Sequence, residues 1–180
     1  APPSAALDSY WAGDLYGARA LLEAAAAAQP DDADLQAWLA ETCRRLGDGW
    51  NATRHAWSAL TLEPCHAFAH TVIADATNPQ FGSGAWVHAD TTWVHGLAAV
   101  ACDSTYGQAW LGIWCEALRR GDEARERAAL RQLYQGGFHT PCALEYARWL
   151  LGSMPRNALL IVNGDLDTYP TLSLQQEENL

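Results

Sequence analysis

The sequence predicts an all-α fold: a solenoid of stacked antiparallel helix pairs, followed by a short C-terminal tail of strand, loop and helix. Two observations predict it. The same residue types recur at an offset of 34 positions near the N-terminus, and apolar residues recur at helical spacing along most of the chain. We therefore expect a helical repeat domain over residues 1–152 and a separate tail over residues 153–180.

Glycine, alanine and proline carry the repeat. The matched residues are Gly13 and Gly47, Ala18 and Ala52, Ala25 and Ala59, and Pro30 and Pro64. Glycine suits the tight turn within a helix pair, alanine lets two helix backbones approach closely, and proline ends the second helix. Together with Leu39, these residues resemble the tetratricopeptide repeat (TPR) family, whose period is 34 residues. The family's usual aromatic residue in the first helix is replaced, with Trp11 and Trp38 at shifted positions.

The rest of the chain follows the same plan less strictly. Trp110-Leu111-Gly112 resembles the family's Trp/Leu-Gly signature, and Gly121-Asp122 repeats the turn. A loop is expected over Thr77–Gly84. The expected helices are Cys65–Asp75, Ala85–Ala101, Tyr106–Arg119, Glu123–Tyr134 and Pro141–Leu151. The sequence therefore predicts four helix pairs and one extra helix, and the TPR resemblance implies a surface that binds other proteins.

The tail has a different pattern. Residues 158–162 form an apolar, partly β-branched run that predicts a buried strand, and Tyr169–Glu178 reads as a helix that opens at Pro170. The segment Asn163–Pro170 resembles one found in bacterial membrane proteins related to protein O-mannosyltransferases, and one in bacterial TPR proteins of unknown role. This chain has no apolar run long enough to span a bilayer, so the transferase activity is not carried over.

A single strand needs a partner for its backbone N–H and C=O groups, and the sequence contains no second strong strand. Three alternatives stay open: an irregular extended segment, a small hairpin, or strand addition to another copy of the chain. Strand addition implies an oligomer, and a head-to-tail arrangement implies a filament. The candidate subunit-contact residues are Leu159, Leu160, Ile161, Val162, Asp165, Asp167 and Tyr169.

Composition limits the classes of partner and the compartment. A net charge of -10 argues against nucleic acid and anionic membranes as partners. All eleven basic residues are Arg, which indicates a GC-rich bacterial source, and the start without Met fits a mature exported chain. We expect a secreted, extracellular or periplasmic protein. The cysteines are Cys43, Cys65, Cys102, Cys115 and Cys142; either they are buried free thiols or one or two disulfides form, with the pairing open.

Candidate chemistry is sparse. Asp165 and Asp167 form a weak DxD pattern that favours a structural turn over a metal site. His66 and His70, four residues apart, lack a third metal ligand, and His88 and His95 are interpreted in the same way, as packing or surface residues. Asn51 begins the one N-x-T sequon and is a possible glycosylation site. We expect no catalytic residue, no cofactor and no metal.

Three functional hypotheses follow. The first is a non-enzymatic interaction protein whose partner is another copy of itself, joined through the tail strand into an extracellular filament. The second is a monomeric TPR scaffold that binds a different protein. The third is a processed fragment of a glycosyltransferase-related enzyme, with the tail as the first step of a lost α/β domain.

Overall fold

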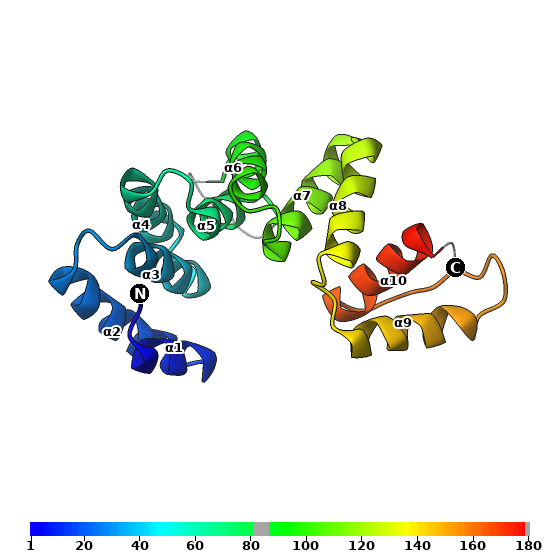
Figure 1. The fold of residues 1–180 in the computed structure, drawn as a ribbon, viewed down its shortest axis with the longest axis horizontal. Coiled ribbons are helices and arrows are strands. Elements are labelled where there is room, and N and C mark those ends of the chain that lie inside the picture. Colours follow the sequence, from blue (N-terminus) through cyan, green and yellow to red (C-terminus); the bar gives the residue numbers. More distant parts are fainter. Residues whose placement is uncertain (81–86, 179–180) are drawn as a thin grey trace. The chain divides into compact units, whose positions relative to one another are not determined.

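The computed structural model describes residues 1–80 and 87–178, and within them it contains ten α-helices and no β-strand (Figure 1). The helices are α1 Ser4–Trp11, α2 Leu15–Ala28, α3 Ala33–Arg45, α4 Gly49–Leu62, α5 Ala67–Thr77, α6 Ala89–Cys102, α7 Gly107–Arg120, α8 Glu123–Gln135, α9 Pro141–Gly152 and α10 Asp165–Glu177. The predicted all-α class is confirmed. None of these helices is both long and apolar enough to cross a bilayer.

The chain divides into two compact units, Ala1–Ser104 and Thr105–Leu180. In unit 1, three helix hairpins (α1/α2, α3/α4 and α5/α6) stack in chain order, because α2 packs on α3 and α4 packs on α5. In unit 2, α7 pairs with α8, and α10 packs on both α8 and α9. The expected boundary between residues 152 and 153 falls inside unit 2, and α9 forms a pair with α10 where the sequence predicted one extra helix.

The Gly-Asp dipeptides form the turns within three of the helix pairs. Gly13, Gly47 and Gly121 have φ values of 85°, 77° and 69°, in the left-handed region that side chains rarely adopt. The aspartate that follows each glycine caps the next helix: Asp48, for example, accepts a hydrogen bond from the backbone N–H of Asn51. One dipeptide therefore both ends the first helix and starts the second.

Small residues let the helix pairs of unit 1 pack closely. Ala18, Ala52 and Ala59 are fully buried, while Ala25 is partly buried against the core cluster that contains Ala52. The larger side chains around them include Leu22, Leu35 and Leu39, each at most 2 % exposed. Pro30 and Pro64 lie two residues beyond the ends of α2 and α4, where a residue that cannot continue a helix is tolerated.

A disulfide closes the third hairpin of unit 1. Cys65, just before α5, bonds Cys102 at the end of α6, with 5.2 Å between their Cα atoms. The bond joins the open ends of two antiparallel helices, opposite their connecting segment. Cys43, Cys115 and Cys142 are not disulfide-bonded, and they are buried, half-buried and exposed respectively. Of the two alternatives for the cysteines, disulfide formation is therefore the one that the structure shows for Cys65 and Cys102.

The predicted strand is absent from the described residues. Residues 158–163 connect α9 to α10 as an extended segment, and no backbone hydrogen bond in the described chain involves residues 159–163. The reason is the missing partner: no other extended segment in this part of the chain is available to pair with it. The side chains of Leu159 and Ile161 are 87 % and 85 % exposed, so the segment is not a buried core strand.

Helix α10 begins at Asp165, four residues before the predicted start at Tyr169. Gly164, with φ at 114°, ends the extended segment, and Asp165 and Asp167 in the first turn suit the positive end of the helix dipole. Pro170 therefore lies inside the helix, where it removes one backbone hydrogen bond but is itself buried. Contacts between side chains attach this helix to the neighbouring helices.

Those side chains form a polar clamp around Glu178. Arg148 of α9 donates from Nε to the Glu178 carboxylate at 2.9 Å, and Tyr134 of α8 donates its hydroxyl at 2.6 Å. These hydrogen bonds lower the pKa of Glu178 to about 2. Behind them, Leu174 is fully buried, and the Nε2 atom of His139 lies 3.0 Å from the Ser173 hydroxyl. One leucine and a set of polar contacts thus hold the last helix.

The third hairpin differs from its prediction at both helices. Helix α5 begins and ends two residues later than expected, with His66 as its cap, and α6 begins at Ala89, capped by His88. The expected start of that helix at Ala85, with Trp86 in its apolar face, and the second half of the expected loop lie among residues 81–86, outside the described residues.

Candidate protein-interaction surfaces

A row of aromatic rings crosses the first helices of unit 1. Trp38 of α3 lies at its centre, with Tyr10 and Trp11 of α1 at 5.4 and 6.3 Å and Phe68 of α5 at 5.1 Å, all edge-on. We call these four residues the aromatic row. Trp11 is 74 % exposed. Edge-to-face packing fixes the rings in place, so an exposed indole is presented on a rigid support.

Charged side chains lie beside the aromatic row and contact it. Glu41 and Arg45 follow Trp38 at positions i+3 and i+7, so all three lie on one face of α3. The Tyr10 hydroxyl donates to Glu41 at 2.9 Å, and the Arg45 guanidinium lies 5.7 Å from the centre of the Tyr10 ring. Burial, together with the Glu41 charge, raises the pKa of Tyr10 to about 12. The phenol therefore stays protonated and links α1 to α3.

A second polar group on this face belongs to α5. Burial raises the pKa of Asp75 to about 6, although the charge of Arg44 opposes the shift. Arg44 itself donates two hydrogen bonds to Glu41, at 2.6 and 2.7 Å. Three consecutive first helices, α1, α3 and α5, thus contribute to one surface of mixed aromatic and charged character.

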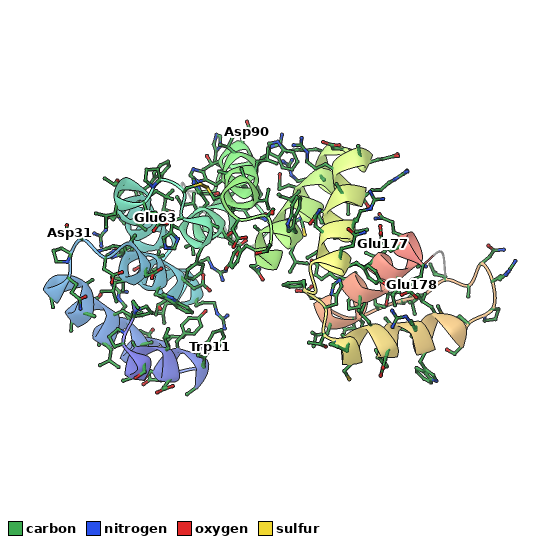
Figure 2. The ribbon with its side chains drawn as sticks, in the orientation of Figure 1. Trp11, Asp31, Glu63, Asp90, Glu177 and Glu178 are labelled. Atoms are coloured by element: carbon green, nitrogen blue, oxygen red, sulfur yellow. A yellow bond between two sulfur atoms is a disulfide. The ribbon has the colours of Figure 1, made fainter. Side chains whose placement is uncertain are left out.

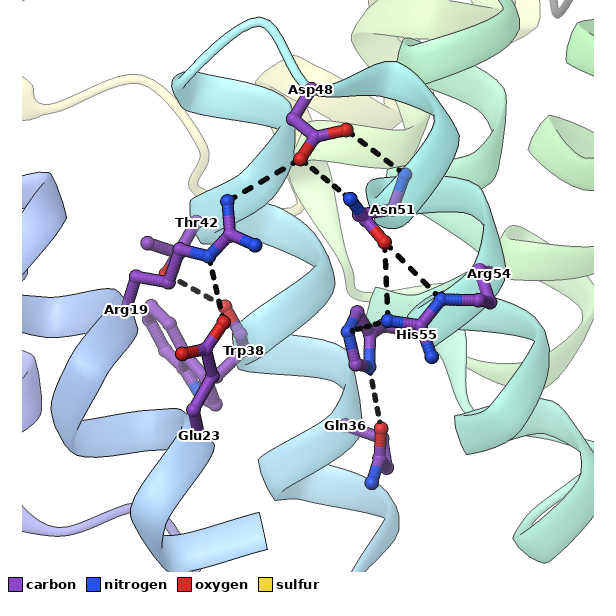
Figure 3. Close-up of polar contacts among 9 residues, drawn as sticks. All are labelled: Arg19, Glu23, Gln36, Trp38, Thr42, Asp48, Asn51, Arg54 and His55. Atoms are coloured by element: carbon purple, nitrogen blue, oxygen red, sulfur yellow. Dashed lines mark hydrogen bonds and ion pairs between the residues drawn. The ribbon is translucent and has the colours of Figure 1, made fainter. Parts of the chain in front are cut away.

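A polar network joins the second helices α2 and α4 of unit 1 and reaches the first helix α3 (Figure 3). Arg19 of α2 binds Glu23 at 2.8 Å and Asp48 at 3.3 Å, and Asp48 also accepts from the side-chain amide of Asn51 at 2.7 Å. Arg54 then donates to the Asn51 side-chain oxygen at 3.1 Å. The sequon asparagine therefore lies in the first turn of α4 with both ends of its amide engaged, and its glycosylation stays a prediction.

The network ends on a neutral histidine. Arg54 can only donate, so the Nε2 atom of His55, 2.7 Å away, accepts, and the His55 Nδ1–H donates to Gln36 at 2.8 Å. Burial, together with the positive charges of Arg54 and Arg19, lowers the pKa of His55 to about 4. The network consequently joins helices from two repeats without an extra positive charge at neutral pH.

The histidines singled out in the sequence do not gather into a metal site. His66 binds Asp34 of α3 at 3.2 Å, whereas His70 faces His95 of α6, with their Nδ1 atoms 2.9 Å apart. His88 caps α6 through its ring nitrogen. Within residues 1–80 and 87–178, no group of three or more potential ligands is placed to hold a metal ion. The His70–His95 pair depends on helix pairing, which spacing along one helix cannot show.

The expected subunit-contact residues fall into two groups. Leu159 and Ile161 point to solvent, while Leu160 and Val162 are half-buried. Tyr169 is used inside unit 2: its ring packs edge-on against Trp114 at 5.4 Å, and its hydroxyl lies 3.6 Å from the Cys115 sulfur. The four aliphatic members thus lie in one extended segment with alternating exposed and half-buried side chains, and Asp165 and Asp167 lie just after it, in the first turn of α10.

Sequence reasoning missed two surfaces. The aromatic row was missed because Tyr10 and Phe68 do not match the repeat, although the spacing of Trp38, Glu41 and Arg45 was a usable signal. The other is an exposed face of α4 with Trp50 and Trp57, 69 % and 50 % exposed. Their separation of seven residues puts both indoles on one side of the helix. A sequence alone does not say whether such a face is buried.

Helix hairpins, Gly-Asp turns and stacked first and second helices define a TPR-like fold, and solved structures agree. The chain is similar to TTC0263, a thermophilic TPR protein of Thermus thermophilus, at 18 % identity and a TM-score of 0.62, over 94 % of this chain and 95 % of that one. It is also similar to two crystal structures of MamA, at 15 % identity with a TM-score of 0.59 (98 % and 90 % covered) and at 14 % with 0.57 (96 % and 94 % covered).

At these identities the likeness establishes the fold, not the function. No protein-family model matches the sequence. No curated protein matches it either.

Proposed function

We propose that the chain is a non-enzymatic protein-interaction module of the TPR type, and that its partner is another copy of itself. The observation that carries the proposal is the extended segment 158–163: residues 159–163 have no backbone hydrogen bond within the described residues, and two aliphatic side chains are more than four-fifths exposed. Exposed apolar side chains on an unpaired extended backbone form a ready template for another chain.

Further exposed apolar side chains support association. On α9, Tyr146 and Trp149 stack with their ring centres 6.1 Å apart, and both are largely exposed. On α1, Trp11 is exposed as well. Exposed aromatic side chains are unfavourable in water and often mark interaction sites, so those of α1 and α9 favour association of copies into a larger assembly.

The disulfide supports an extracytoplasmic location as part of the proposal. Disulfides such as Cys65–Cys102 persist in oxidising compartments and are rare in the cytosol. Together with the exposed segment, this favours a secreted or periplasmic subunit that assembles outside the cytoplasm, in keeping with a bacterial origin.

A second candidate function rests on the aromatic row. A rigid, exposed Trp11 beside ordered charges on three first helices is suited to bind an extended segment of a different protein. Such a scaffold would act as a monomer, and its binding would depend on Trp11 and Arg45 without involving the segment 158–163.

Sedimentation velocity over a range of concentrations, with negative-stain imaging, tests the proposal. The wild-type chain is expected to form oligomers or filaments, and the variant Leu159→Asp/Ile161→Asp is expected to remain monomeric. The matched control is Leu118→Asp, which changes a 53 % exposed leucine on α7 and should assemble like wild type. A wild-type monomer at high concentration, or a double variant that still assembles, would contradict the proposal.

A further inference from the structure

A hollow on the second-helix face of unit 1 is available to bind a partner. It has a volume of about 430 Å³, within the range of small binding pockets, and two exposed indoles of α4 stand along it. Its lining residues are Trp50, Thr53, Arg54, Trp57, Thr77 and Thr91, from α4, α5 and α6. We call it the tryptophan groove.

The threonine hydroxyls of the groove are already engaged within the chain. The Thr53 hydroxyl donates to the Gly49 carbonyl at 2.9 Å, and the Thr77 hydroxyl donates to the Ile73 carbonyl at 2.8 Å. The Thr91 hydroxyl lies 3.1 Å from a ring nitrogen of His88. A sugar or nucleotide would find few free partners here, because such ligands need unsatisfied donors and acceptors. Aliphatic side chains need none, so the lining favours an apolar ligand.

The charge of Arg54 at the groove has no counter-ion among the residues that the structure describes. The Arg54 guanidinium binds the Asn51 amide oxygen and the His55 ring, both neutral, and no ion pair to Arg54 exists among the described residues. Arginine prefers a carboxylate, which it can bind with two parallel hydrogen bonds. The groove therefore suits an apolar stretch followed by an acidic group.

The chain's own segment 158–167 has this composition. Leu159 and Ile161 are its exposed apolar residues, and Asp165 and Asp167 follow with no ion pair in the described part of the chain. Its dimensions also fit. Trp50 and Trp57 are about 10 Å apart along α4 at 1.5 Å per residue, whereas Leu159 and Ile161 are about 7 Å apart in an extended chain.

We propose that the tryptophan groove of one copy receives the segment 158–163 of a second copy, with Leu159 and Ile161 between the two indoles and Asp165 or Asp167 paired with Arg54. The inference rests on the proposed self-association and names its receptor site. Because the groove and the segment are different surfaces, the contact is heterologous, and repeated addition produces a chain of copies.

A labelled peptide of residues 156–168 tests the groove directly. The receptor is the Leu159→Asp/Ile161→Asp chain, which offers the groove but not a competing segment, and fluorescence anisotropy reports binding. Adding Trp50→Ala/Trp57→Ala should weaken binding at least tenfold. The control Tyr16→Ala, which removes a 78 % exposed aromatic ring on α2 outside the groove, should leave the affinity unchanged. Circular dichroism checks that each variant is folded.

A charge exchange gives the second measurement. Arg54→Glu should weaken binding of the natural peptide several-fold, and a peptide with Asp165→Arg and Asp167→Arg should recover it. If the peptide binds equally well to chains with Trp50→Ala/Trp57→Ala and with Arg54→Glu, the inference is overturned. If Leu159→Asp/Ile161→Asp nevertheless abolishes self-association, the proposed function still stands. A third outcome is that the wild-type chain is monomeric and does not bind the peptide, whereas the Leu159→Asp/Ile161→Asp chain does. The segment of each chain would then occupy that chain's own groove, which would overturn the second copy as occupant.

Discussion

Units 1 and 2 share their local design and differ in what holds their helices together. Both contain a buried glutamate three residues before an arginine near the end of a first helix, Glu41 in α3 and Glu116 in α7, and both follow it with a Gly-Asp turn. In unit 1, a disulfide and an alanine-rich core also hold the helices together. Figure 2 shows the side chains of the chain as sticks. Unit 2 holds its last helix with a polar clamp.

The two glutamates show the difference in detail. Glu41 accepts from Tyr10 of α1 as well as from Arg44 of its own helix, so it links two helix pairs. Glu116, 1 % exposed, binds Arg119 and Arg120 of its own helix. The same short motif thus serves cohesion between repeats in one unit and local order in the other. The repeat sequence thus specifies a helix pair, and the helices packed against that pair determine which contacts stabilise it.

Removing the disulfide should have the largest effect. Cys65→Ser/Cys102→Ser releases a loop closed over 37 residues, which is expected to cost about 4 kcal/mol of unfolding free energy because the unfolded chain gains freedom. Urea denaturation measures the loss, and hydrogen exchange by mass spectrometry assigns it to α5 and α6. The control is Cys142→Ser, at an exposed free thiol. Equal loss of protection in α7–α10 would show that the units are not separately secured.

Removing the apolar anchor of α10 comes next. Leu174→Ala deletes a fully buried side chain and should cost about 3 kcal/mol, with hydrogen-exchange protection lost first in Asp165–Glu177. Leu166→Ala, at an 83 % exposed leucine of the same helix, should change stability by less than about 0.5 kcal/mol. If both variants behave alike, polar contacts rather than Leu174 hold the helix.

Acid should act on the two units in different pH windows. His55 has a lowered pKa, so its neutral form is favoured in the folded chain. Its contribution is fully present above pH 6.5 and is lost as pH falls to about 4. Glu178 also has a lowered pKa, but as a carboxylate. The clamp is fully present above pH 4.5 and is lost as pH falls to about 2.

Stability should be compared between wild type and His55→Gln at pH 7 and at pH 5. The comparison is needed because Asp75, whose pKa is raised to about 6, stabilises the folded chain as pH falls and so opposes the effect of His55. Both chains contain Asp75, so the difference between them reports His55 alone. We expect the stability advantage of wild type to shrink by about 1 kcal/mol between these pH values, allowing for partial exposure. Denaturation curves of both chains measure it. An advantage that stays constant with pH would mean that His55 protonates as easily in the folded chain as in the unfolded one.

The smallest effects concern glycine. Gly47→Ala and Gly121→Ala meet no atom within 4 Å, so their cost is backbone strain at positive φ, about 1 kcal/mol, and should be equal in the two units. Gly112→Ala lies within α7, also meets no atom within 4 Å, and should stabilise by up to about 1 kcal/mol. Thermal denaturation compares the three variants. A cost confined to Gly47 would indicate that the turns are not equivalent.

Much of the fold was readable from local signals. Gly13, Gly47 and Gly121 mark turns because positive φ excludes most other residues, and the aspartate after each glycine caps the next helix. By contrast, the run Leu159–Val162 has the composition of a strand, yet a strand exists only where a partner satisfies its backbone. The start of α10 was missed for a related reason, since Pro170 suggests a first turn while contacts made by the helix place it further in.

The candidate sites divide in the same way. The sequence by itself determined the helical repeat, the turns and the apolar character of the segment before α10, because these depend on residues close together in the chain. The tertiary structure decided which cysteines pair, which histidines meet, and that Trp50 and Trp57 lie exposed beside a groove. Those outcomes depend on which helices become neighbours, and packing between distant segments settles that.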